Sequence, residues 1–307
     1  MNNIKLSNNN ILHPNWITGF VDAEGCFTIK FGQSKSCKTG WFVQAIFQLN
    51  VHVRDKNLLL KIKSFFNEIG TIRIDSKNNK VCYRIHKIND INKIIIPHFE
   101  NYPLITNKQS DFVLWKDIVK LINKDKDKYK NGITEIINIR ASLNKGISDN
   151  LSIYFTNITK VKRSRVNIPI TIDYDWFAGF FSGDGCFYIE ITKSKTSIIN
   201  YTVRLRALIG QHSRDELLID ALANILGYGT IYRNLNRNFS TFTVSNFKDI
   251  YNKLIPMFSE DKIEGIKSLD FKDFCLAAEL INKKSHLTLE GINEIMTIKS
   301  RMNLARY

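Results

Sequence analysis

The sequence repeats itself at an almost constant spacing, and this feature restricts the fold more than any other. Trp16 and Trp176 lie 160 positions apart, and GITEIINIRASLN (132–144) matches GINEIMTIKSRMN (291–303) at a spacing of 159. Chance does not maintain such a register over this length, so the chain contains two copies of one unit of roughly 130 residues.

The duplication predicts the domain organisation. We expect a disordered lead-in, a first repeat, a basic linker that contains the run TKVKRSR, and a second repeat, at 1–13, 14–145, 146–172 and 173–307 respectively. The five cysteines are scattered and form no CxxC pair, which argues against a disulfide framework or a structural zinc site. We therefore expect reduced thiols in an intracellular compartment.

Each copy shows the same succession of helical and strand patterns. A short helix precedes two strands, a helix, two more strands and further helices; the predicted ranges are 14–24, 26–35, 41–51, 54–69, 70–76, 80–86, 89–96, 106–123 and 132–144 in the first copy, and 174–184, 186–194, 200–210, 213–227, 229–235, 239–245, 247–257, 263–282 and 288–303 in the second. This order predicts an α+β fold of two pseudo-symmetric αββαββα repeats, each with an antiparallel four-stranded sheet backed by helices.

The predicted strands alternate between apolar and polar residues, so each sheet has one face for helices and one polar face. An ordinary solvated face is the plain interpretation, but the polar face favours Lys, Arg, Gln, Thr and Tyr, which suit base edges and phosphates. The predicted DNA-binding residues on the strands are Thr28, Lys30, Gln44, Gln48, Arg73, Lys80, Arg84, Tyr188, Glu190, Thr192, Arg204, Arg206, Tyr232 and Arg233.

The net charge of +15 points in the same direction. Such an excess of basic residues indicates a polyanionic partner, most often nucleic acid, although a solvated Lys-rich surface would give the same count. No apolar run approaches the length of a membrane span, so no membrane association is expected.

Two short motifs end the first helix of each copy. In ITGFVDAEG (17–25) and FAGFFSGDG (177–185), small residues recur four positions apart, at Gly19 and Ala23 and at Gly179 and Gly183. This spacing lets two helix backbones approach closely, either within each domain or between the two copies across a pseudo-twofold axis.

One acid follows each small pair, Glu24 in the first copy and Asp184 in the second. A carboxylate near a helix C-terminus is unfavourable unless a cation lies beside it, and hard oxygen ligands with open positions suit Mg²⁺. Asp22 has Ser182 as its counterpart, so we interpret Asp22 as structural.

The paired motifs resemble the LAGLIDADG signature of homing endonucleases, in the single-chain, two-repeat form often encoded by introns of fungal mitochondrial genes. The resemblance covers nearly the whole chain. It implies a saddle of two sheets that binds double-stranded DNA, a monomer, and cleavage of both strands with 3′ overhangs. It also implies two or more Mg²⁺ ions shared at the interface of the repeats.

The resemblance also assigns the site. Glu24 and Asp184 become the metal-binding acids, and the backbone carbonyls of Ala23 and Gly183 complete the coordination. Gln211 is the expected water-ordering group, and its counterpart is Val51. Lys80 and Arg237 are the expected basic residues near the second hairpins, whereas Lys108 and Lys267 could approach phosphates or simply be solvated.

Two other functions stay open. An RNA maturase on the same scaffold would bind its own intron RNA, and a non-catalytic DNA-binding regulator would not need the two acids. Retention of both acids favours cleavage. The absence of a transit-peptide pattern and the richness in Asn, Ile and Lys suit synthesis inside a mitochondrion.

Overall fold

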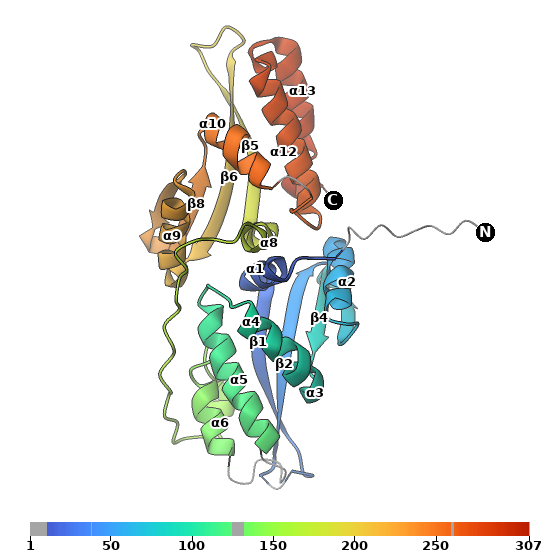
Figure 1. Cartoon of the computed structure of the whole chain (residues 1–307), viewed down its shortest axis with the longest axis vertical. Helices are drawn as coiled ribbons and strands as arrows, with labels where there is room; N and C mark the ends of the chain where they lie inside the picture. Colours follow the sequence, from blue (N-terminus) through green and yellow to red (C-terminus); the bar gives the residue numbers. More distant parts are fainter. Residues whose placement is uncertain (1–10, 38, 125–131, 259–260, 307) are drawn as a thin grey trace, which may run out of the picture. The chain divides into compact units, whose positions relative to one another are not determined.

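Each repeat folds around one four-stranded antiparallel sheet in the computed structural model (Figure 1). The structure describes residues 11–37, 39–124, 132–258 and 261–306. Most of the predicted lead-in therefore lies outside the described residues, and no helix in the described part of the chain is long and apolar enough to span a membrane.

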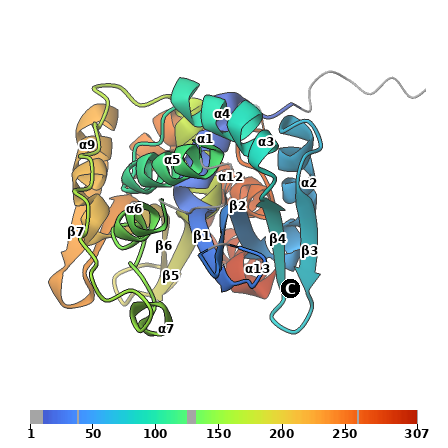
Figure 2. The same cartoon turned by 90° about the horizontal axis from the view of Figure 1, so that it is seen from below.

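The first repeat has the predicted order of elements. Its strands are β1 (Gly25–Gln33), β2 (Trp41–His52), β3 (Thr71–Asp75) and β4 (Lys80–Ile85), arranged β1-β2-β4-β3. Its helices are α1 (Pro14–Glu24), α2 (Lys56–Phe65), α3 (Ile88–Asp90), α4 (Ile96–Asn101), α5 (Lys108–Lys124) and α6 (Ile133–Arg140), with the 3₁₀ turn η1 (Val53–Asp55) and the π-helical turn η2 (Ile91–Ile95). Figure 2 shows α2 beside β3 and β4.

The second repeat has the same topology. Its strands are β5 (Gly185–Lys193), β6 (Tyr201–His212), β7 (Thr230–Asn234) and β8 (Phe239–Val244), arranged β5-β6-β8-β7. Its helices are α8 (Tyr174–Asp184), α9 (Glu216–Leu226), α10 (Phe247–Asp249), α11 (Ile255–Met257), α12 (Lys267–Asn282) and α13 (Leu289–Ser300), and its shorter turns are η3 (Ser213–Asp215), η4 (Leu235–Arg237), η5 (Ile250–Leu254), η6 (Ser285–Leu287) and η7 (Asn303–Ala305). The predicted α+β fold is confirmed.

The compact units of the chain do not coincide with the repeats. One unit is Met1–Pro14 with Glu24–Asn167, and the other is Asn15–Ala23 with Ile168–Tyr307. Most of α1 thus packs with the second repeat, whereas most of the predicted linker packs with the first. The linker also contains a helical turn that the sequence did not predict, α7 (Asp149–Ser152).

The two cores are built from equivalent aromatic residues. Phe27 on β1 lies at the centre of the first core, with ring centroids 5.3 Å from Phe112 and 5.2 Å from Trp115. Phe187 takes its place in the second core, 5.0 Å from Phe271 and 5.1 Å from Phe274. The duplicated sequence therefore encodes a duplicated core.

One asparagine locks the last helices to the sheet in each repeat. Asn144 (φ 52°) donates its backbone N–H to Asp111 Oδ1 at 2.8 Å and its amide Nδ2 to the Phe27 carbonyl at 2.7 Å. Asn303 (φ 56°) donates to Asp270 and to the Phe187 carbonyl, both at 3.0 Å. Asparagine tolerates this left-handed conformation better than most residues. The same residue therefore forms the turn and makes the hydrogen bonds that hold the helices to the sheet.

His98 predicts a pH dependence of stability. The residue is 8% exposed, and burial lowers the pKa of its imidazole from 6.5 to about 4. In the unfolded chain the imidazole binds a proton below about pH 6.5, whereas in the folded chain it binds one only below about pH 4. The free energy of unfolding should therefore fall by about 3 kcal/mol as the pH falls from 6.5 to 4.

We expect His98→Phe to remove this part of the pH dependence. The measurement is urea unfolding of both proteins at pH 7 and at pH 5, an interval in which about 2 kcal/mol of this loss should occur. Because other groups titrate equally in both proteins, the two proteins differ in the slope of unfolding free energy against pH only through the imidazole. Equal slopes would show that His98 keeps an ordinary pKa.

Candidate functional site

Helices α1 and α8 touch backbone to backbone within the second unit. A Cβ added to Gly19 would lie 1.9 Å from the Trp176 carbonyl oxygen, and one added to Gly179 would lie 2.0 Å from the Trp16 carbonyl oxygen. Such separations leave no room for a methyl group. The glycines therefore permit an approach that any other residue would block.

Two indoles secure this helix pair in different ways. Trp176 donates its Nε1–H to the buried carboxylate of Asp22 at 2.8 Å, and Trp16 donates to the Lys262 carbonyl at 2.8 Å. Ser182, the counterpart of Asp22, donates to the Ala178 carbonyl and accepts the backbone N–H of Glu264. Asp22 therefore has a structural role in the helix pair, and its counterpart Ser182 makes different contacts.

The predicted acid of the second repeat ends α8 and is half-buried. Asp184 Oδ2 accepts a hydrogen bond from Gln211 Nε2 at 2.5 Å, so the glutamine near the end of β6 fixes the orientation of the carboxylate. Lys267, the first residue of α12, donates its ammonium to the Gly183 carbonyl at 2.6 Å and to the Phe181 carbonyl at 3.2 Å. A carboxylate, a carbonyl, an amide and an ammonium group thus lie together in one small region.

Lys267 gives this region a basic group that the sequence only weakly indicated. Lys108 occupies the equivalent position, and each lysine acts on the thiol that lies two residues after the acid of its own repeat. Burial raises the pKa of Cys26 and of Cys186, and the positive charges of Lys108 and Lys267 oppose these shifts. The identical spacing of the two lysines was the sequence signal.

The predicted acid of the first repeat, Glu24, is the last residue of α1 and is half-buried. Val51 stands where the second repeat has Gln211, so this position of the first repeat carries no amide side chain. The predicted basic residues Lys80 and Arg237 are exposed on β4 and on η4 respectively. Their place in catalysis stays a prediction.

Most of the predicted DNA-binding residues share the polar face of their sheet. Lys30 lies directly opposite Gln44 in the register of β1 and β2, and Arg84 donates to the side chain of Gln48 at 3.1 Å. The other members of this face in the first repeat are Thr28, Arg73 and Lys80.

The polar face of the second repeat is organised in the same way. Glu190 lies opposite Arg204 and forms a salt bridge with Arg206 at 2.8 Å. Glu190 therefore neutralises part of the positive charge of this face. Its other members are Tyr188, Thr192 and Tyr232.

Arg233 corrects the predicted set. Neighbouring residues of a strand point to opposite faces, so Arg233 cannot share the face of Tyr232. Its guanidinium forms ion pairs with Glu216 and Asp220 of α9, on the helix side of the sheet. The alternation along β7 predicts this placement, so the signal was present in the sequence.

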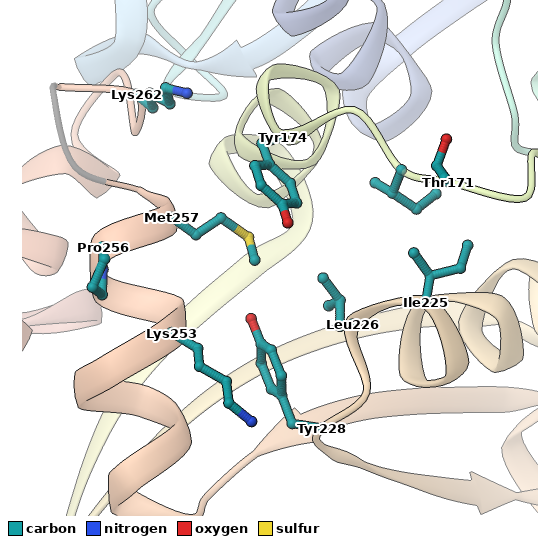
Figure 3. Close-up of a pocket in the computed structure, with 10 residues that line it drawn as sticks. Thr171, Tyr174, Ile225, Leu226, Tyr228, Lys253, Pro256, Met257 and Lys262 are labelled. Atoms are coloured by element: carbon teal, nitrogen blue, oxygen red, sulfur yellow. The ribbon is translucent and has the colours of Figure 1, made fainter.

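A separate hollow of about 650 Å³ lies on the helix side of the second unit (Figure 3). Tyr228 and Met257 line it, and the Tyr228 hydroxyl has no hydrogen-bond partner among the described residues. None of the predicted site residues lines this hollow. It is therefore distinct from the cluster around Asp184.

Comparison with known proteins gives the family. The LAGLIDADG endonuclease family model matches residues 17–119 and 177–278. Probable intron-encoded endonuclease 2 of Neurospora crassa is 40% identical over 95% of this chain, and probable intron-encoded endonuclease 3 of the same fungus is 38% identical over 93%. The chain spans 65% and 54% of the lengths of these two relatives.

Solved structures agree with the sequence relatives. The I-SmaMI LAGLIDADG homing endonuclease bound to cleaved DNA superposes with a TM-score of 0.92 at 38% identity, over 96% of this chain and 98% of that one. I-SmaMI bound to an uncleaved DNA target in the presence of calcium ions matches with a TM-score of 0.91, at 38% identity over 95% and 99% of the two chains. Since the family match covers both repeats, the chain belongs to the LAGLIDADG endonuclease family.

Proposed function

We propose that the protein is a site-specific double-strand DNA endonuclease that requires a divalent metal ion and leaves 3′ overhangs. The observation that carries the proposal is the cluster at the end of α8, where Gln211 holds the Asp184 carboxylate and Lys267 lies at the Gly183 carbonyl. In relatives named as intron-encoded endonucleases, this activity would promote intron mobility.

The donor set fits a hard cation. Asp184 offers carboxylate oxygens and Gly183 a carbonyl oxygen, which are ligands that Mg²⁺ and Ca²⁺ prefer. Glu24 and the Ala23 carbonyl offer the same chemistry in the first repeat. A bound divalent ion lowers the pKa of coordinated water and neutralises charge on a phosphate, and the calcium in the I-SmaMI structure makes such an ion a reasonable partner here.

The remaining residues prepare this chemistry. Hydrolysis forms a new oxygen–phosphorus bond from water, breaks one phosphodiester bond, and delivers a proton to the leaving oxygen. Gln211 holds the Asp184 carboxylate in one orientation, so the carboxylate is preorganised before DNA binds. Lys267 supplies positive charge beside the site, where charge increases on the phosphate during the reaction.

DNA would bind along the polar faces of the two sheets. Lys30, Gln44 and Arg84 present donors in the first repeat, and Arg204 and Arg206 present donors in the second. Phosphate contacts would give a salt-dependent affinity, and base contacts would give specificity. The I-SmaMI complexes support a single chain bound to duplex DNA.

We also propose a mitochondrial location, supported by the intron-encoded relatives.

The test is selection of cleaved sites from a randomised duplex library with and without Mg²⁺. We expect one dominant site, metal-dependent cleavage of both strands and 3′ overhangs. No cleavage of any duplex by the native chain, together with tight binding of its intron RNA, would replace the endonuclease proposal with the maturase alternative.

Gln211 gives a graded prediction at the selected site. Gln211→Val copies the residue of the first repeat and removes the amide that holds Asp184. We expect the single-turnover cleavage rate to fall about 10- to 100-fold, as for the loss of other groups that orient a metal ligand. Val51→Ile, which removes no amide, is the matched control and should change the rate less than about threefold. Equal rates for both variants would leave Gln211 without a role.

A further inference from the structure

The hairpin of β1 and β2 carries apolar side chains out to its tip. Phe31 lies directly opposite Val43, and Gln33 lies directly opposite Trp41, so Phe31, Val43 and Trp41 share one face. This is the helix-side face, because Phe27 and Ile29 on the same alternation are buried in the core. Lys30 and Gln44 lie on the other face, which is the polar one.

A segment of the linker covers this apolar tip. We call residues 148–155, which include α7, the brace. The ring of Trp41 lies 5.1 Å from that of Tyr154 and 5.5 Å from that of Phe155, and the ring of Phe31 lies 6.4 Å from that of Phe155. All of these residues belong to the first unit. Three aromatic contacts therefore connect the linker to the end of the hairpin.

The hairpin and the brace also line one cavity together. This cavity of about 480 Å³ is lined by Gly32, Gln33 and Trp41 of the hairpin and by Leu151 and Ile153 of the brace. Aromatic pairs of this kind stabilise the contact beyond the effect of their buried area.

The second repeat lacks such cover among the described residues. Tyr201 is the counterpart of Trp41, and none of the described aromatic rings packs against it. Val43 is 6% exposed, whereas its counterpart Val203 is only half-buried. The two hairpins have the same register but different support.

We propose that the brace is a specificity-determining element, with Tyr154 and Phe155 as positioning residues for the first hairpin. The inference rests on the proposed endonuclease function. A two-stranded hairpin is only marginally stable without support, whereas discrimination between bases requires reading groups held to within about 0.5 Å. When the hairpin is held rigid, a wrong base pair weakens DNA binding more, because the side chains that contact the bases cannot move to accommodate it.

The length of β1 indicates which base pairs are affected. β1 starts at Gly25, next to Glu24, and reaches the tip at Gln33, and the eight steps between these two residues span about 26 Å, or about eight base pairs. The tip therefore meets the part of the target farthest from the cut. The first repeat should read these outer base pairs more strictly than the second repeat reads its own.

The first measurement does not depend on DNA. Amide hydrogen exchange of residues 33–43 is compared in the native chain, in the double variant Tyr154→Ala/Phe155→Ala, and in Tyr154→Phe. We expect exchange at least about 10-fold faster in the double variant and near-native exchange in Tyr154→Phe. Unchanged exchange in the double variant would overturn the brace.

The second measurement is binding selection from libraries randomised at the outer base pairs of either half-site, with Tyr201→Ala as the matched variant of the second hairpin. We call the half of the target contacted by the first repeat the first half-site. In the double variant, discrimination between bases should fall about 10-fold at the outer base pairs of this half-site only. Cleavage of the preferred site should stay within about threefold of native.

The outcomes separate the two proposals. Equal loss at inner and outer base pairs, or a native preference pattern in the double variant, would overturn the specificity role even if exchange accelerates. A native chain that selects no DNA would refute the endonuclease and this role of the brace together, whereas the exchange result would still decide whether residues 148–155 hold the hairpin.

Discussion

Asp184→Asn is expected to abolish DNA cleavage and to leave DNA binding intact. The substitution keeps the size of the side chain and removes the negative charge that would hold the metal ion at the end of α8. We expect the cleavage rate to fall about a thousandfold or more, which corresponds to ~4 kcal/mol of transition-state stabilisation. Affinity for the selected duplex should stay the same or increase slightly, because a negative charge near the phosphates is lost.

Asp220→Asn is the matched control, because it makes the same chemical change at a half-buried position of α9, where Asp220 pairs with Arg233. Cleavage and binding by this control should stay within about twofold of native. Glu24→Gln should reproduce the loss seen for Asp184→Asn. If Asp184→Asn cleaved within tenfold of the native rate, the assignment of this carboxylate to the metal would be wrong.

The second large effect is on folding. Alanine forms helices better than glycine by about 1 kcal/mol, so Gly179→Ala would stabilise an isolated α8. In the protein, the new methyl group would lie 2.0 Å from the Trp16 carbonyl oxygen and 2.8 Å from its carbonyl carbon. The helices must separate, and we expect a net loss of about 3 kcal/mol or more in the free energy of unfolding.

Urea unfolding of the purified variant measures this loss. Glu294→Ala, at an exposed position of α13, is the control for a small change in a helix and should stay within about 0.5 kcal/mol of native. If Gly179→Ala does not fold, Gly19→Ala makes the same comparison on the facing helix, where the new methyl group would lie 1.9 Å from the Trp176 carbonyl. A native stability for either variant would contradict the backbone contact.

Much of this architecture follows from the duplicated register. Equivalent apolar positions such as Phe27 and Phe187 predict equivalent cores, and the alternation along β1 and β2 predicts which side of the sheet the helices cover. The family resemblance implied a place for Gln211 beside the acid, and Gln211, near the end of β6, does donate to the Asp184 carboxylate.

Other features depend on contacts that no local pattern contains. The contact of Lys267 with Gly183 depends on where α12 begins against α8, and these residues are 84 positions apart. No pattern around Tyr154 and Phe155 distinguishes them from other linker residues, because their role depends on the contact with Trp41 at the hairpin tip. Arg233 shows a different limit, since the alternation needed to place it was present in the sequence.

The hydrogen bond between Trp176 and Asp22 has a consequence for any attempt to divide the chain. The second repeat supplies the indole donor and the first supplies the acceptor. In a symmetric dimer of the second repeat alone, each Trp176 would meet the neutral hydroxyl of Ser182 in place of the buried carboxylate of Asp22. The two halves are therefore not interchangeable, because each carries only one of the two groups that form this buried hydrogen bond.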